Sequence, residues 1–175
     1  MTASPRSPGL QLLAFQGVWI VSAFGAAAGM AWPGIVSAVV LLGWYVLAVG
    51  GGHRGIVLAL SCGLTGLIAE TALVGFGWVR YGAPWPHPDL APIWVIGLWA
   101  AFATTLQPTR RLLGLMPLTK AAVVGALLGP LSYLAGERIG ALTLAEPVWT
   151  SLFATAAVWC IGLPALLALS ARLGR

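Results

Sequence analysis

The chain is dominated by apolar stretches, each close to the length that crosses a lipid bilayer as a helix. A transmembrane helix needs about 20 predominantly apolar residues, and six stretches of this kind follow one another along the sequence. Four of them are 10–28, 55–79, 92–107 and 148–169, which are the first, third, fourth and sixth stretches. The second follows the turn at 32–34 and lasts to 49, and the fifth starts near 120 and contains 125–141. This pattern predicts an all-α polytopic membrane protein, with residues 1–175 forming a single transmembrane domain, a six-helix bundle.

Charge and composition exclude the main soluble classes. Only 7% of the residues are charged, whereas 59% are hydrophobic, and soluble domains carry about 25% charged residues. The net charge of +5 is not gathered into a basic patch with interleaved aromatic residues, so no nucleic-acid partner is expected. The N-terminus imitates a secretory signal, but we expect it to remain as the uncleaved first helix, because cleavage would leave five spans.

The basic residues predict how the bundle is oriented in the membrane. If the six spans alternate in direction, seven of the nine basic residues fall on the same side: Arg6, Arg54, Arg110, Arg111, Lys120, Arg172 and Arg175. Arg80 and Arg138 fall on the other side, together with Asp89, Glu137 and Glu146. Because cytoplasmic loops carry the excess of Lys and Arg, both termini are expected in the cytoplasm.

The fifth span carries a row of residues without bulky side chains. Gly125, Gly129, Ser132, Gly136 and Gly140 recur at steps of four, three, four and four, so they share one helix face. Such a face lets membrane helices approach closely. Pro130 interrupts the backbone hydrogen bonding within this pattern and is expected to kink the helix. We therefore expect the fifth span to pack centrally, with its glycine face against another helix.

Glu70 is the most informative polar residue, because it lies within the third apolar span. An ionisable group there is costly unless it is protonated, paired or facing water. Ser132 and Tyr133 lie at a similar outward depth on the fifth span, so we expect Glu70 to point into the bundle near one of them. Two interpretations stay open: a polar binding site in the outer half of the membrane, or a glutamate whose hydrogen bonds only hold helices together.

The candidate binding residues surround that acid or lie on other spans. They are Glu70, Thr71, Ser132, Tyr133, Gly129, Pro130, Gln16 and Trp94. Gln16 is explained equally well by hydrogen bonding between helices. His87 and Asp89 lie on the proline-rich loop 80–91, where two ligands are weak evidence for a metal, so no metal or other cofactor is expected.

The distribution of histidines argues against most membrane enzymes. His53 and His87 both fall in loops between the spans, whereas membrane haem sites, di-iron oxidases and serine intramembrane proteases need histidines within them. Catalysis stays open for this chain, but the sequence favours a protein that is not an enzyme.

Several short motifs together resemble a known family over nearly the whole chain. They include Phe15-Gln16 with Trp19, Gly66 with Glu70-Thr71, Pro92-Ile93-Trp94, and the run from Gly129 to Tyr133. These are similar to the bacterial proteins grouped as domain-of-unknown-function family 2878, in which an aspartate is common at the position of Glu70. The resemblance implies a small multi-pass protein of the bacterial inner membrane without an assigned activity, and it associates the chain with enzymes that modify membrane fatty acids.

Three functions are compatible with these features. The first is a protein that binds a small molecule or lipid, or a transporter-like subunit, with its site around Glu70 and the 129–133 kink. The second is a non-catalytic membrane scaffold or partner subunit of a lipid-modifying enzyme, with the small-residue faces as docking surfaces. The third, an enzyme acting on lipid through Glu70 and Tyr133, ranks last because no nucleophile or metal set accompanies them.

Overall fold

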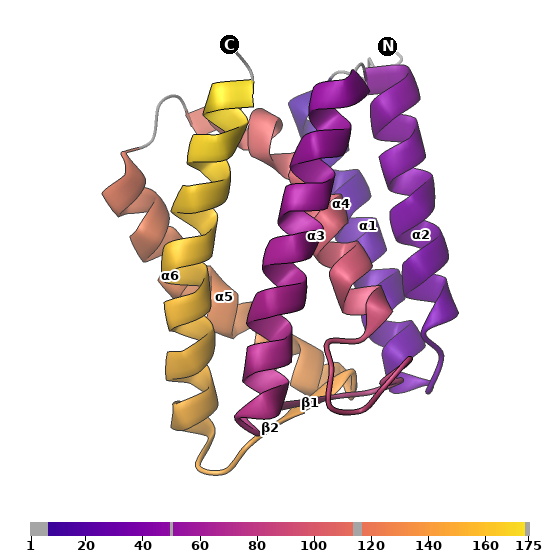
Figure 1. The fold of residues 1–175 in the computed structure, drawn as a ribbon, viewed down its shortest axis with the longest axis vertical. Coiled ribbons are helices and arrows are strands. Elements are labelled where there is room, and N and C mark those ends of the chain that lie inside the picture. Colours follow the sequence, from indigo (N-terminus) through magenta and orange to yellow (C-terminus); the bar gives the residue numbers. More distant parts are fainter. Residues whose placement is uncertain (1–6, 50, 114–116, 174–175) are drawn as a thin grey trace.

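The computed structural model describes residues 7–49, 51–113 and 117–173 and shows the predicted all-α membrane bundle (Figure 1). Within these residues, a π-helical turn follows the second of six α-helices, and two short strands connect the helices at one end. The elements are α1 (Pro8–Ala27), α2 (Trp32–Trp44), η1 (Tyr45–Val49), α3 (Gly52–Gly75), β1 (Val79–Tyr81), α4 (Ile93–Leu113), α5 (Leu118–Ile139), β2 (Leu142–Leu144) and α6 (Val148–Leu173).

Five helical segments of the described chain are long and apolar enough to cross a membrane, namely α1, α2 with η1, α3, α5 and α6. The helix α4 is also long enough, but its second half is polar, with Thr104, Thr105, Gln107 and Arg110. This helix contacts α1, α2, α3 and α6, and Thr104 and Thr105 are buried. Neighbouring helices therefore shield α4 from lipid, which explains why it can be less apolar than the others.

The central helix is α4 and not α5, so the expected central position of the fifth span is wrong. In Figure 1, α4 lies in the middle of the bundle, while α5 crosses behind α6 at one side. Packing of α5 is mainly along α6, with smaller contacts to β2 and α1. Its outward face is exposed, with Leu127 at 63% and Leu131 at 57%. That apolar face lies on the outside of the bundle, where lipid would surround it.

The glycine face of α5 does pack closely, as expected: Gly125 and Gly129 lie against α6, and Gly136 lies against Leu142 of β2. A Cβ atom at Gly125 would lie 2.2 Å from the carbonyl oxygen of Trp159, and one at Gly129 would lie 2.5 Å from its ring carbon Cδ1. Any side chain at these two positions would collide with α6. The helix continues through Pro130 and ends before Gly140, whose φ of 88° favours glycine.

Several expected helix ends differ from the structure. The third helix begins at Gly52 and not at 55, so His53 lies in its first turn and not in a loop, and the sixth helix ends at Leu173 and not at 169. The third helix ends at Gly75 and not at 79, because Gly77 adopts a φ of 73° and the chain enters β1. The fourth helix extends past 107 to Leu113, continuing through the buried Pro108.

The strands β1 and β2 form an antiparallel ribbon that the sequence did not predict. Val79 pairs with Leu144, and Tyr81 pairs with Leu142. The ribbon lies at the end of the bundle opposite the start of α1 and the end of α6 (Figure 1). Hydrogen bonds tie it to the helices. Among them, Glu137 Oε1 accepts a hydrogen bond from the Leu144 amide at 2.8 Å, and the Ser151 hydroxyl donates to the Trp78 carbonyl at 2.7 Å.

Candidate functional site

Glu70 lies on α3 with its side chain almost completely buried, at 1% exposure. Its oxygen Oε1 accepts hydrogen bonds from the Tyr133 hydroxyl at 2.5 Å and from the Trp99 indole Nε1 at 2.7 Å. The Tyr81 hydroxyl donates to Oε2. These donors come from α5, α4 and β1, so one carboxyl group joins four elements of the fold. No basic side chain in the described part of the chain forms an ion pair with it.

Tyr81 reaches the carboxyl group from the ribbon, outside the helices that span the membrane. Burial raises the pKa of the Tyr81 phenol well above its ordinary value, and the neighbouring charge of Glu70 raises this pKa further. The phenol therefore keeps its proton at physiological pH and remains a hydrogen-bond donor to Glu70.

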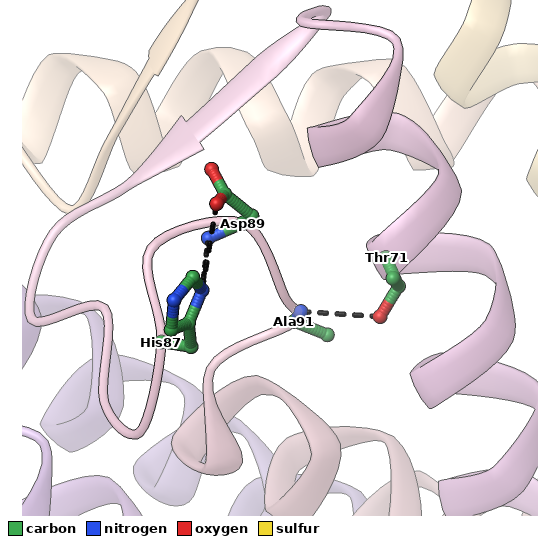
Figure 2. A network of polar contacts seen from close by, with 4 residues as sticks. All are labelled: Thr71, His87, Asp89 and Ala91. Atoms are coloured by element: carbon green, nitrogen blue, oxygen red, sulfur yellow. Dashed lines mark hydrogen bonds and ion pairs between the residues drawn. The ribbon is translucent and has the colours of Figure 1, made fainter.

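The expected contact between Glu70 and Tyr133 is present, whereas the alternative partner, Ser132, lies elsewhere. The Ser132 hydroxyl donates to the Gly129 carbonyl at 2.7 Å, a bond within α5 of the kind that serine commonly makes in helices. Thr71 also has a different partner: its Oγ1 accepts a hydrogen bond from the Ala91 amide at 3.1 Å, which ties α3 to the loop before α4 (Figure 2).

A cavity of about 510 Å³ borders the Glu70 cluster. Small-molecule sites in proteins commonly have volumes of about 300–1,000 Å³. The cavity is enclosed by α1, α4, α5, α6 and the ribbon, and Glu70 is the part of α3 that reaches its wall. Its lining is Phe15, Gln16, Trp19, Ala23, Glu70, Tyr81, Trp94, Val95, Leu98, Trp99, Phe102, Gly125, Leu128, Gly129, Leu131, Ser132, Tyr133, Ala135, Gly136, Ala141, Leu142, Trp159 and Leu163.

The cavity opens on the side of the bundle. Gln16 of α1 and both Leu128 and Leu131 of α5 contribute to its lining, and all three are exposed. At the ribbon end, Tyr81 and Leu142 form part of the wall. The opening therefore lies between α1 and α5 at mid-helix, where the surroundings would be hydrocarbon, and the ribbon covers the end nearer to water.

Aromatic rings form much of the cavity wall. Trp99 and Trp159 stack with their ring centroids 4.5 Å apart, and Tyr81 meets Trp94 edge-to-face at 5.7 Å. The Trp94 indole donates to the Gly82 carbonyl at 3.1 Å, which fixes its ring against the ribbon. The buried Trp159 ring packs in the same cluster as Tyr133, and no hydrogen bond of normal geometry from its Nε1 is found among the described residues. The wall is thus made largely of aromatic rings held by their neighbours.

Six of the eight predicted binding residues line this cavity: Glu70, Ser132, Tyr133, Gly129, Gln16 and Trp94. Thr71 and Pro130 do not. Sequence reasoning missed Tyr81 and Trp99 as partners of Glu70, and it missed Trp159 as the surface that meets the glycines. Trp99 did belong to an aromatic-rich fourth span, but nothing in the sequence showed which face of that span would meet Glu70.

The histidine and aspartate of the loop between β1 and α4 interact with each other. His87 Nδ1 lies 3.5 Å from Asp89 Oδ2 and also accepts a hydrogen bond from the Asp89 amide at 3.3 Å (Figure 2). The two side chains therefore support a local turn. Among the described residues, no three or more His, Cys, Asp or Glu side chains are grouped as a metal site would require.

Comparison with known proteins identifies a family but not an activity. The family model described as "Protein of unknown function (DUF2878)" matches residues 9–165. This range contains every residue that lines the cavity. No curated protein and no solved structure matches the chain.

Proposed function

This chain belongs to the DUF2878 family of proteins of unknown function, and from its own geometry we propose that it binds a small molecule or lipid within the membrane. The observation that carries the proposal is the cavity of about 510 Å³ beside the buried Glu70 cluster. The protein would act as a binding protein or as a transporter-like subunit, without catalysing a reaction.

The walls of the cavity suit an amphipathic ligand. Most of the lining is aliphatic or aromatic. Three of its polar residues, Glu70, Tyr81 and Tyr133, form one hydrogen-bonded group, and Gln16 and Ser132 also contribute to the lining. Ligand sites of this type use apolar walls for affinity and a few polar groups for orientation. The side opening between α1 and α5 supports entry from the lipid phase.

The same proposal includes the location and orientation of the bundle. Four basic residues lie near helix ends: Arg54 near the start of α3, Arg110 near the end of α4, Lys120 near the start of α5 and Arg172 near the end of α6. In Figure 1, these helix ends lie away from the ribbon. Arg6 and Arg175 lie outside the described residues. The positive-inside rule supports placing this end in the cytoplasm and the ribbon outside, in a bacterial inner membrane.

The proposal is tested by filling the cavity. Ala135 lines the cavity, whereas Ala157 of α6 is exposed and does not. Native mass spectrometry of the protein purified in mild detergent should detect a bound small molecule in the wild type and in Ala157→Phe, but not in Ala135→Phe. Equal retention by both variants would contradict binding in this cavity.

The same spectra test the alternative function. A stable protein partner at fixed stoichiometry, with no small molecule bound, would favour a scaffold or a partner subunit of a lipid-modifying enzyme over the binding function.

A further inference from the structure

Glu70 lacks a partner of opposite charge within the described structure. Its three hydrogen-bond donors, Tyr81, Trp99 and Tyr133, are neutral, and no Lys, Arg or His lines the adjacent cavity. A carboxylate that is removed from water without a cation nearby is costly, even when it is hydrogen-bonded. A positively charged ligand in the cavity would provide the positive charge that Glu70 lacks among its protein neighbours.

The aromatic walls favour the same kind of ligand. Trp19, Trp94, Trp99 and Trp159 all contribute to the cavity. The faces of aromatic rings attract cations, tryptophan most strongly, and the attraction increases when water is excluded. Groups of aromatic residues are a common way to bind ammonium ions.

The two tyrosines provide contact atoms for an ammonium group. The hydroxyl groups of Tyr81 and Tyr133 both donate hydrogen bonds to Glu70, so lone pairs on both phenol oxygens can still accept one. A phenol that donates to a carboxylate is polarised and becomes a better acceptor. An ammonium group in the cavity can therefore donate to a phenol oxygen, while Glu70, itself nearly enclosed, acts through the tyrosines.

We propose that the ligand is a lipophilic amine, with an ammonium head beside Tyr81 and Tyr133 and an apolar chain along the cavity towards the opening between α1 and α5. This inference rests on the proposed function and specifies its ligand class. The lining of α1 runs from Phe15 to Ala23, about 12 Å at 1.5 Å per residue, which accommodates an extended chain. Because the wall holds no basic side chain for a phosphate, the site favours an amine over a zwitterionic phospholipid.

The test compares four amphiphiles that share a dodecyl chain and differ in the head: dodecylammonium, dodecanol, dodecanoate and dodecylphosphocholine. Each is titrated into the full chain in phosphatidylcholine nanodiscs, and occupancy is measured by native mass spectrometry. We expect dodecylammonium to bind most tightly. Glu70→Gln should weaken its binding about tenfold or more, since an interaction with a charge is lost, and should weaken dodecanol binding much less.

Trp19→Leu provides a second variant that leaves the Glu70 hydrogen bonds in place. It should weaken dodecylammonium binding more than dodecanol binding, because it removes an aromatic face but keeps an apolar wall. Equal losses for the two amphiphiles would contradict a role for the ring in binding the cation.

The remaining outcomes separate this inference from the proposed function. If dodecanol or dodecanoate binds as tightly as dodecylammonium, the cation preference is wrong but an intramembrane binding site remains. If dodecylphosphocholine binds as tightly, the site accepts a phospholipid head equally well and the proposed preference for an amine is wrong. If none of the four binds, both the inference and the proposed function fail.

Discussion

Each carboxyl oxygen of Glu70 is occupied by hydrogen bonds, so the effects of substitution should depend on how many of these bonds the new side chain keeps. Tyr81, Trp99 and Tyr133 all donate to this residue. Glutamine retains an oxygen acceptor, and its amide can donate to a phenol oxygen. Leucine offers neither.

We expect Glu70→Leu to destabilise the protein strongly and Glu70→Gln to change its stability little. Leucine leaves buried donors unsatisfied, at about 1–3 kcal/mol for each. Thermal unfolding in mild detergent measures the difference. A leucine variant as stable as the wild type would show that the hydrogen bonds of Glu70 contribute little to folding.

The sequence predicted one partner of Glu70 and missed two. Tyr133 could be predicted because depth along a membrane helix follows from residue number, and both residues lie at a similar depth. Tyr81 could not, because it reaches the carboxyl group only after β1 pairs with β2. Trp99 could not, because the rotation of α4 about its axis is set by its packing against several helices.

At the scale of elements, the small residues of α5 determine how it packs on α6. Gly125 and Gly129 both lie against Trp159. The Trp159 ring in turn stacks on Trp99, which donates a hydrogen bond to Glu70. The glycines therefore help to place an aromatic wall of the cavity beside the buried acid.

Gly129→Leu should destabilise the protein far more than Leu127→Ala. A Cβ at Gly129 would already lie 2.5 Å from the Trp159 ring, whereas the Leu127 side chain is 63% exposed. Overpacking costs about 1–3 kcal/mol or more. The two variants can be compared in the same detergent thermal-unfolding assay, and equal shifts in Tm would contradict the close packing of α5 on α6.

Periodicity and apolar length predicted the helices, but not their arrangement or the ribbon. The six apolar runs correspond to six helices, and five helical segments are long and apolar enough to cross a membrane, where a helix satisfies its own backbone hydrogen bonds. The ribbon pairs Val79 with Leu144, far apart in the sequence, and three-residue strands carry too little pattern to be recognised. The helix α4 occupies the central position. Its C-terminal half is polar, so burying this helix among its neighbours avoids exposing polar side chains to lipid.

At the scale of the whole molecule, charge and fold agree on two distinct ends. The ribbon and the proline-rich loop lie at one end, and the start of α1 and the end of α6 lie at the other (Figure 1). The cavity opens between these ends, so its ligand would reach it through the membrane.

Single cysteines should report this orientation in intact bacterial cells, in a variant in which Cys62 and Cys160 are replaced by alanine. Pro86 lies in the exposed loop near the ribbon, and Arg54 is exposed at the start of α3. A membrane-impermeant thiol reagent should label Pro86→Cys from outside, and it should label Arg54→Cys only after lysis. The reverse pattern would place the ribbon in the cytoplasm.

The most direct test of the central claim, an intramembrane binding cavity beside Glu70, is to map where a membrane-dissolved ligand contacts the protein. A dodecylammonium analogue with a photoreactive diazirine in its chain can be crosslinked in nanodiscs and the labelled peptides identified by mass spectrometry. We expect labels concentrated on residues 15–23 of α1 and 128–136 of α5, and we expect these labels to be lost in Ala135→Phe but not in Ala157→Phe. Labels spread evenly over lipid-facing positions such as Leu60 and Leu64 of α3, and unchanged in Ala135→Phe, would contradict the central claim.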